Sequence, residues 1–288
     1  MYKSIRPARN LVRSLFLTAM ITLPHFLGAQ GEELPNYLRD RGTGVASSMF
    51  GTYIRHRELI TYMYFEYYLD ENMEYKPAEL GYGLEEDFRG KYRAAEGLIF
   101  IGYGLTDWLA IELEAAIIKA KLWKSSDDPS SLPNSIEESG LGDVESQLRW
   151  RWLKETPLRP ELFGYFETVF PLQKDKMLIG TQEWELKLGS GITKGFSFGT
   201  FSLRAAVEYA TEESKVELGE YAVEYVKRLF PRWRIYLGVE GSQDEVELIT
   251  EAQIHVIPDK IVVKLNNAFG VTSKATDWAP EVGLMLFW

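Results

Sequence analysis

The feature that most constrains this chain is a period-two alternation of apolar and charged residues. Residues 144–152 read VESQLRWRW, with apolar or small residues at the even positions and Glu, Gln and Arg at the odd positions. Successive side chains of a β-strand point to opposite faces, so this spacing gives one strand an apolar face and a charged face. On a helix the two sets would be scattered around the axis. The alternation therefore predicts a strand.

The same pattern recurs along most of the chain, and clusters of Gly, Pro, Asn and Asp separate the repeats. It predicts an all-β fold with twelve strands joined by turns. The links at 70–90, 124–141 and 172–181 are long, whereas a link such as 258–259 is short. Long loops on one side and tight turns on the other are typical of an outer-membrane barrel, whose turns face the periplasm. The predicted strands cover residues 57–69, 91–104, 107–123, 142–153, 160–171, 182–193, 199–211, 217–229, 233–242, 246–257, 260–271 and 280–288.

Alternation alone does not say which face meets water. In a soluble β-sandwich the apolar face is buried, whereas in a membrane barrel it faces lipid. Three features favour the barrel. The last predicted strand carries an apolar row that ends at Trp288, and the polar faces of the strands are rich in ionic residues. Seven of the eight tryptophans lie near predicted strand ends or in a loop, where an interfacial aromatic girdle would lie.

We therefore predict a closed, antiparallel, up-and-down transmembrane β-barrel of about twelve strands at residues 57–288. A secreted, soluble β-protein is the alternative. The expected partners are outer-membrane lipid and lipopolysaccharide. The barrel-insertion machinery is a further expected partner, because the strand that closes on Trp288 resembles the C-terminal signal that this machinery reads.

The N-terminal residues predict an export signal. Residues 1–29 contain Lys3, Arg6, Arg9 and Arg13 and no acid, then a short apolar run and the small residues Gly28 and Ala29. The apolar run is shorter than the roughly 20 residues of a membrane-spanning helix. We expect a signal peptide at 1–29 and a final location in the outer membrane of a Gram-negative-type cell. Residues 30–56 would form an N-terminal segment, either as a periplasmic tail or as a plug inside the barrel.

The charged rows of the predicted strands would face the lumen of such a barrel. Acids outnumber bases in these rows, which predicts a preference for cations if the lumen is open. Twelve strands lie between the eight that side chains fill and the 16 to 18 that leave an aqueous channel, so these side chains or the N-terminal segment decide whether it conducts. The predicted lumen-lining residues are Glu112, Glu114, Glu145, Arg149, Arg151, Glu183, Glu185, Lys187, Arg204, Glu208, Glu220, Glu224, Glu240, Glu247, Glu251, His255 and Lys264.

Composition argues against catalysis and cofactors. The chain has no cysteine and three histidines, so thiol chemistry and a His-rich metal centre are disfavoured. No G-x-S-x-G elbow is present, and His56 and His255, the two histidines beyond the predicted signal peptide, are expected near the periplasmic side. The net charge of −10 disfavours a nucleic-acid partner. We predict that the protein is not an enzyme and has no cofactor or metal site.

Two short segments resemble a known family. Residues 102–108 read GYGLTDW and residues 140–144 read GLGDV. Over roughly residues 90–288 the chain is similar to the outer-membrane barrels named for the meta-pathway of phenol degradation, which typically carry a YGLTD turn and a GxGD segment that enters a strand. The resemblance implies transport of small, often aromatic, compounds, and it implies no catalytic residues.

The residues of these two segments also have a simpler interpretation. Residues 104–107 predict a tight turn in which Gly104 adopts an unusual φ and Asp107 binds the backbone. Residues 140–143 predict the end of a surface loop.

The functional prediction is a passive channel or transporter for small solutes, with the substrate left open. The alternative is a closed structural or partner-binding surface barrel without conductance.

Overall fold

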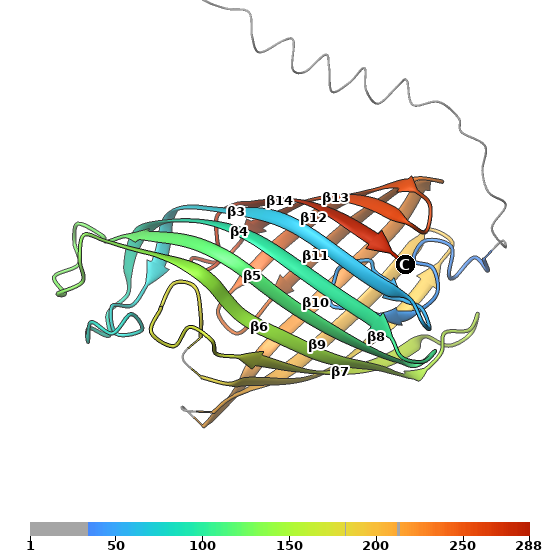
Figure 1. The fold of residues 1–288 in the computed structure, drawn as a ribbon, viewed down its shortest axis with the longest axis horizontal. Helices are drawn as coiled ribbons and strands as arrows, with labels where there is room; N and C mark the ends of the chain where they lie inside the picture. Colours follow the sequence, from blue (N-terminus) through green and yellow to red (C-terminus); the bar gives the residue numbers. More distant parts are fainter. Residues whose placement is uncertain (1–33, 182, 212–213) are drawn as a thin grey trace, which may run out of the picture. The chain divides into compact units, whose positions relative to one another are not determined.

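Extended, alternating segments dominate the structure, a computed structural model that describes residues 34–181, 183–211 and 214–288. Twelve described strands form one closed barrel in the order β10-β11-β12-β13-β14-β3-β4-β5-β6-β7-β8-β9, each antiparallel to its neighbours (Figure 1). The sheet closes where β14 pairs with β3, with Val282 opposite Phe65. Two further strands, β1 and β2, form a small hairpin of their own. No described helix is long and apolar enough to cross a membrane.

The predicted signal peptide at 1–29 lies outside the described residues. Within the described residues, the strand bounds follow the alternation closely. The strands are β1 (Val45–Ala46), β2 (Tyr53–Ile54), β3 (Leu59–Tyr75), β4 (Phe88–Gly104), β5 (Leu109–Trp123), β6 (Ser135–Leu153), β7 (Glu161–Phe170), β8 (Glu185–Phe196), β9 (Gly199–Ala210), β10 (Lys215–Phe230), β11 (Trp233–Gly241), β12 (Val246–Ile257), β13 (Ile261–Gly270) and β14 (Ala279–Phe287).

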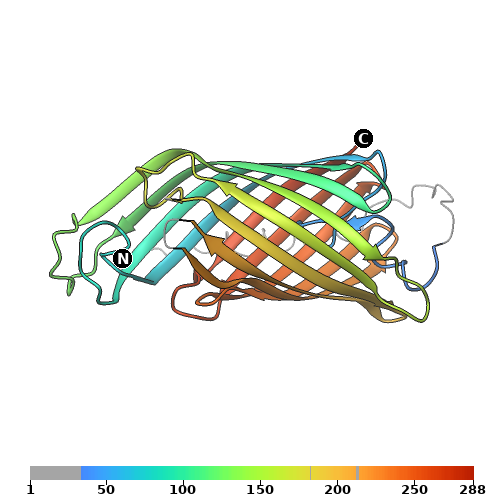
Figure 2. The same ribbon diagram turned by 90° about the horizontal axis from the view of Figure 1, so that it is seen from below.

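The predicted fold class is confirmed: the described chain is all-β, with a closed, up-and-down, antiparallel barrel of twelve strands. Because these strands form one closed sheet, a β-sandwich is wrong. The main differences lie in the long links. β3 extends to Tyr75 and β6 begins at Ser135, since charged residues predicted as loop pair across the strands, as Glu74 does with Arg89. Figure 2 shows β3 to β6 projecting beyond the other strands at this long-loop end.

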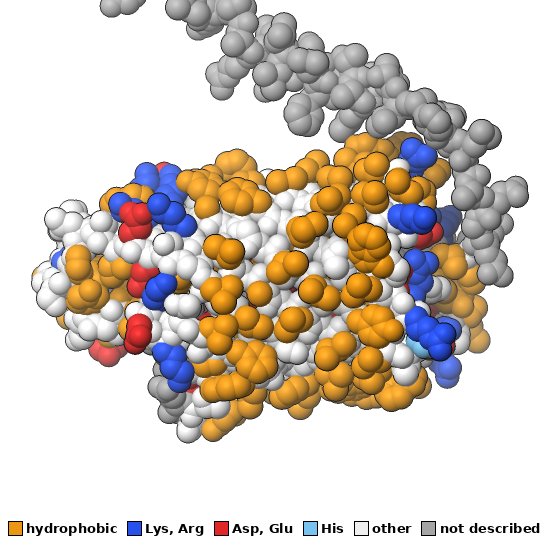
Figure 3. Space-filling model, in the orientation of Figure 1, with side chains coloured by type: hydrophobic (Ala, Val, Ile, Leu, Met, Phe, Trp, Pro, Cys, Tyr) orange, Lys and Arg blue, Asp and Glu red, His pale blue; other side chains and the backbone are white. Residues whose placement is uncertain are grey.

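The apolar rows face away from the barrel axis. Leu148 and Leu203 are 39% and 48% exposed, whereas Arg149, one residue along from Leu148, is 2% exposed. A broad apolar band covers the wall, with Lys and Arg gathered at both of its edges (Figure 3). This arrangement is the reverse of a soluble sheet, in which the apolar face is buried.

Candidate functional site: the barrel interior

A stretch of chain that precedes the barrel lies inside it. We call residues 37–54 the inner segment; it contains the β1–β2 hairpin, whose turn is held by hydrogen bonds between Ser47 and Thr52 and between Thr52 and Met49. These residues belong to the segment predicted at 30–56, and their side chains and backbone contact the inner wall of the barrel. The inner segment contacts inward-facing residues of every barrel strand. These include Tyr62 of β3, Phe100 of β4, Glu112 of β5, Arg149 of β6, Phe163 of β7, Gly195 of β8, Arg204 of β9, Val226 of β10, Tyr236 of β11, Gln253 of β12, Lys264 of β13 and Met285 of β14.

Apolar packing anchors one side of the inner segment. Val45 and Ile54 are fully buried against a cluster that includes Ile60, Phe100 and Met285. Removal of this apolar area from water stabilises the docked position by about 25 cal/mol per Å². The packing is close, because a Cβ added at Gly102 would lie 2.7 Å from the Ile54 side chain.

The glycines of the GYGLTDW segment make room for the inner segment. A Cβ at Gly104 would overlap with the backbone carbonyl of Arg55, the residue that directly follows the inner segment and leads into β3. Gly104 is absent from the residues with positive φ, so the predicted unusual φ is wrong and close approach is the reason for glycine here. The turn itself is held by Thr106, whose hydroxyl accepts a hydrogen bond from the Trp108 amide.

Charged side chains hold the backbone of the inner hairpin from several directions. Arg149 donates to the Ala46 carbonyl at 2.6 Å, and Lys264 donates to the Phe50 carbonyl at 2.8 Å. On β5, next to the strand of Arg149, Glu112 accepts a hydrogen bond from the Ser48 hydroxyl at 2.6 Å. The hairpin turn thus has cations at its carbonyl groups and a carboxylate at its donor, which satisfies buried polar groups that would otherwise be costly.

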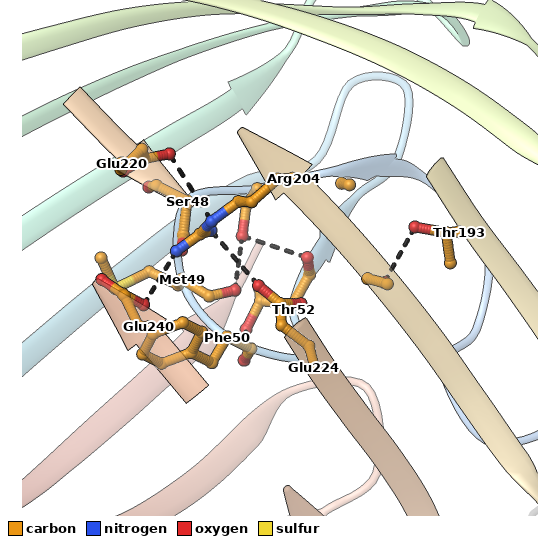
Figure 4. Close-up of polar contacts among 12 residues, drawn as sticks. Ser48, Met49, Phe50, Thr52, Thr193, Arg204, Glu220, Glu224 and Glu240 are labelled. Carbon is orange, nitrogen blue, oxygen red and sulfur yellow. Dashed lines mark hydrogen bonds and ion pairs between the residues drawn. The ribbon is translucent and has the colours of Figure 1, made fainter. Parts of the chain in front are cut away.

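Arg204 is the centre of the largest ionic cluster beside the hairpin (Figure 4). Its guanidinium lies 3.1 Å from Glu240, 3.4 Å from Glu224 and 3.6 Å from Glu220. The same group donates to the Ser48 carbonyl and lies over the Phe50 ring. One cation therefore connects three strands of the wall to the tip of the inner segment.

The inner segment fills the lumen at this level. A cavity of about 10 Å³ remains between the hairpin and the wall, beside Arg149, Phe163 and Arg204. That volume holds about one water molecule.

A second ionic cluster, which we call the clasp, fixes the inner segment at the short-turn end. The Arg41 guanidinium lies 3.0 Å from both Glu155 and Glu161, and Arg151 also reaches Glu161 at 3.0 Å. Burial alone would lower the pKa of Arg41, but the charges of Tyr53, Glu161 and Glu155 raise it, so this side chain stays protonated. Asp40 adds a hydrogen bond from the Arg228 amide at 3.0 Å. The clasp is a buried ionic cluster.

The lumen on the long-loop side of the hairpin has a different charge balance. Glu114 lies directly opposite Glu145 across β5 and β6, and Glu66 lies opposite Glu281 across β3 and β14. Lys187 offsets part of this charge, at 2.9 Å from Glu167 and 3.6 Å from Glu208. We call this region the acidic half; its inward carboxylates are Glu66, Glu96, Glu114, Glu145, Glu167, Glu185, Glu208 and Glu281.

The loop between β7 and β8 folds back over this half. Asp143 accepts hydrogen bonds from the amides of Leu172 and Thr181, so it holds both ends of the loop. Ile179, 4% exposed, packs against Ala94 and Ala120 on the inner wall. The GLGD segment thus lies within β6 rather than at the end of a surface loop, because it pairs with β5, and its aspartate organises the neighbouring loop.

The structure brings eight of the seventeen predicted lumen residues into three groups. Arg204 joins Glu220, Glu224 and Glu240; Lys264 lies 3.3 Å from Glu251, and Arg149 lies 3.8 Å from Glu112. Arg151 belongs to the clasp, and His255 faces inward near the same end. Glu183 precedes β8, which begins at Glu185 rather than at the predicted residue 182. The remaining predicted residues, on the inward rows of the long-loop side, are Glu114, Glu145, Glu185, Lys187, Glu208 and Glu247.

Several interior residues were not among the sequence predictions. Glu161 and Glu167 share an inward row with Phe163 and Tyr165, so the alternation of β7 could have identified them. Arg41 and Glu155 are 114 residues apart, and no local pattern indicates that they meet.

Comparisons with known proteins identify the fold. No family model and no curated protein matches the chain, so the meta-pathway family stays a prediction. Among solved structures, the COG4313 outer membrane channel from Pseudomonas putida F1 has a TM-score of 0.60 at 13% identity, covering 82% of this chain and 97% of that one. The translocator domain of the autotransporter NalP from Neisseria meningitidis has a TM-score of 0.49 at 9% identity, covering 80% of this chain and 88% of that one. The first likeness shows a shared barrel fold.

Proposed function

We propose that this protein is an outer-membrane channel for the passive passage of small solutes, and that the inner segment is its gate. The contact of residues 37–54 with all twelve strands is the observation that carries the gate. In the described position the hairpin and its ionic partners obstruct the lumen, so permeation requires the segment to shift or leave.

The outward apolar rows support a membrane location. They form a broad band on the face shown in Figure 3, and the closed sheet leaves no unpaired strand edge to lipid. The shared fold with an outer membrane channel and the predicted signal peptide at 1–29 support the same placement. By the usual orientation of such barrels, the long-loop end faces outward and the clasp faces the periplasm.

The acidic half favours cations among the solutes. A narrow lumen lined by more carboxylates than bases lowers the energy of a positive ion and raises that of an anion. The interior offers polar and charged groups, so we propose small polar or cationic solutes ahead of neutral aromatic ones. The described residues contain no cluster of three or more His, Cys, Asp or Glu side chains suited to a metal ion. We propose no catalytic activity.

Planar-bilayer conductance tests the gate. We expect low or intermittent current for the full chain and a steady, cation-selective current after deletion of residues 35–54. The chain has no cysteine, so a Thr52→Cys/Met285→Cys variant can be joined by a short bis-methanethiosulfonate reagent, because the Thr52 hydroxyl and the Met285 sulfur lie 3.8 Å apart. The joined protein should stay closed until its two disulfide bonds to the reagent are reduced. A deletion variant that inserts but carries no current would overturn the channel proposal and favour a closed structural barrel.

A further inference from the structure

Five cations gather on the outer wall of two adjacent strands, at the long-loop end. Lys91 and Arg93 of β4 face outward beside Lys119 and Lys121 of β5, and Arg93 is directly opposite Lys121. Arg89 continues the β4 row. We call these five residues the outer basic patch. The interior mechanism proposed above uses none of them.

The patch begins where the apolar band ends. The outward row of β5 runs through Leu109, Ile111, Leu113 and Ile117 to Lys119. At about 3.3 Å per residue and a strand tilt of about 40°, the rise from Leu109 to Lys119 is about 25 Å along the barrel axis, which is the height of the apolar band of an outer-membrane barrel. The ammonium groups therefore lie at the level of lipid headgroups.

Acidic side chains on the same face neutralise only part of the positive charge of the patch. Glu71 is shared by Lys91, at 3.1 Å, and Arg93, while Glu137 is shared by Lys119 and Lys121, each at 3.0 Å. Glu74 pairs with Arg89 at 3.1 Å, so three carboxylates stand against the five cations. A carboxylate that serves two cations neutralises one of them. The cations are also accessible, since the Lys119 side chain is 67% exposed.

The wall below the patch is unusually smooth. Gly97 lies on the outward row of β4 next to Ala95, and a Cβ at Gly97 would meet nothing within 4 Å. Ile99 and Ile117 border this open strip. Ala95 lies opposite Lys119 and Gly97 opposite Ile117, so this strip begins directly below the basic cluster on β4 and β5.

We propose that the outer basic patch binds the phosphate groups of a phosphorylated glycolipid of the outer leaflet, the lipopolysaccharide class, with an acyl chain along the strip at Gly97. Ammonium and guanidinium groups make charge-assisted hydrogen bonds to phosphate oxygens. The cations form two pairs on neighbouring strands, Lys91 with Arg93 on β4 and Lys119 with Lys121 on β5. Two pairs of cations can contact more than one phosphate group of the same headgroup. This site rests on the proposed outer-membrane location and orientation.

Native mass spectrometry of the full chain in detergent tests the site, with diphosphoryl lipid A as the probe. We expect the unaltered protein to retain this lipid, and a variant with Lys91, Arg93, Lys119 and Lys121 all changed to Gln to lose affinity about tenfold or more. A variant with Lys91, Lys119 and Lys121 changed to Arg should retain it. The matched control, Lys154→Gln with Arg159→Gln and Lys260→Gln, removes exposed cations at the short-turn end and should change nothing.

Competing lipids distinguish a glycolipid site from general attraction of anions. Monophosphoryl lipid A should bind more weakly, and phosphatidylglycerol or inorganic phosphate should not displace the diphosphoryl lipid at equal concentration. Equal binding by the Gln variant, or equal binding of phosphatidylglycerol, would overturn the proposal. Heat-modifiable gel mobility verifies that each variant is folded.

Conductance measurements on the same variants separate this proposal from the channel proposal. The Gln variant should keep the conductance of the unaltered protein, because its altered residues lie outside the lumen. Loss of lipid binding with normal conductance supports the site. Normal lipid binding in a protein that never conducts would overturn the channel alone.

Discussion

The two halves of the lumen are enclosed by the same twelve strands but have opposite interiors. Around the hairpin, Arg149, Arg204 and Lys264 bind the backbone of the inner segment and pair with nearby carboxylates. In the acidic half, Glu114 faces Glu145 and Glu66 faces Glu281. The side chains of the first half bind the backbone of the inner segment, and those of the second half carry an excess of carboxylates. In the function proposed above, the first half would therefore gate the lumen and the second would select its ions.

The difference follows from what each half must satisfy. A buried peptide presents carbonyl groups that need donors, and cations supply the strongest ones. A lumen open to ions needs no internal partner for each carboxylate, because water and mobile cations screen the charge. Variants that disturb one half and leave the other intact therefore test whether the two tasks are separate.

The largest effect is expected from Arg41→Ala, which breaks the clasp. It leaves Glu155 and Glu161 buried with less positive charge, and loss of one partner of a buried ionic cluster costs about 3–5 kcal/mol. We expect residues 37–54 to become protease-sensitive and the current to rise, with unchanged barrel mobility on gels. The control is Arg39→Ala, because that side chain is 46% exposed and its pair with Asp40 is worth about 1 kcal/mol or less. Equal protease resistance in both variants would contradict the clasp.

The clasp also marks the limit of what the sequence could predict. Period two identified the strands and the inward rows, because each strand carries its own pattern: Leu148 and Arg149 are assigned to faces by their neighbours alone. The position of residues 37–54 depends instead on pairs such as Arg41 with Glu155, distant in sequence and joined only by closure of the barrel. The extension of β3 to Tyr75 and of β6 back to Ser135 was missed for a related reason. Their polar residues are typical of a loop in the sequence, and only ion pairs with the neighbouring strand hold them in the sheet.

A smaller effect is expected from Gly104→Ala. The added methyl group would overlap with the Arg55 carbonyl, so either the inner segment or the end of β4 must shift, at a cost of about 1–3 kcal/mol. Hydrogen exchange should increase at residues 45–54 while the acidic half is unchanged. Gly97→Ala is the matched control on the same strand, because its methyl group would point into open space. Similar exchange in both variants would mean that close approach at Gly104 does not position the segment.

Removal of charge from the acidic half tests the second half of the lumen while the first is left unchanged. Glu114→Gln with Glu145→Gln, made in the chain that lacks residues 35–54, should reduce the cation-to-anion permeability ratio by about twofold or more, with nearly constant conductance. Reversal potentials in a salt gradient measure the ratio. Glu137→Gln, on the outward face of β6, should leave it unaltered. A ratio equal to that of the deletion parent would remove the acidic half as the source of selectivity.

The smallest effect is a pH dependence at the long-loop end. Burial opposes ionisation of Asp128, but hydrogen bonds from Ser130 and Tyr75 outweigh it and hold the pKa of this carboxyl below its ordinary value. A lowered folded-state pKa gives stability that is present above the unfolded-state value and is lost as the pH falls through the folded one. The protection factors of amides 124–134, which are exchange rates corrected for the intrinsic pH dependence, should therefore be high at neutral pH and fall below about pH 3.8. Asp128→Asn should abolish this dependence, while the inner hairpin stays protected throughout.

The inner segment precedes the first barrel strand but contacts the last ones, and this has a consequence for the order of assembly. Thr52 meets Met285, 233 residues away, and Phe50 meets Lys264, 214 residues away. Such long sequence separations make docking slow relative to the pairing of neighbouring strands. The inner segment can dock completely only after β14 has paired with β3. The barrel therefore passes through an assembly stage in which residues 37–54 do not yet occupy its interior.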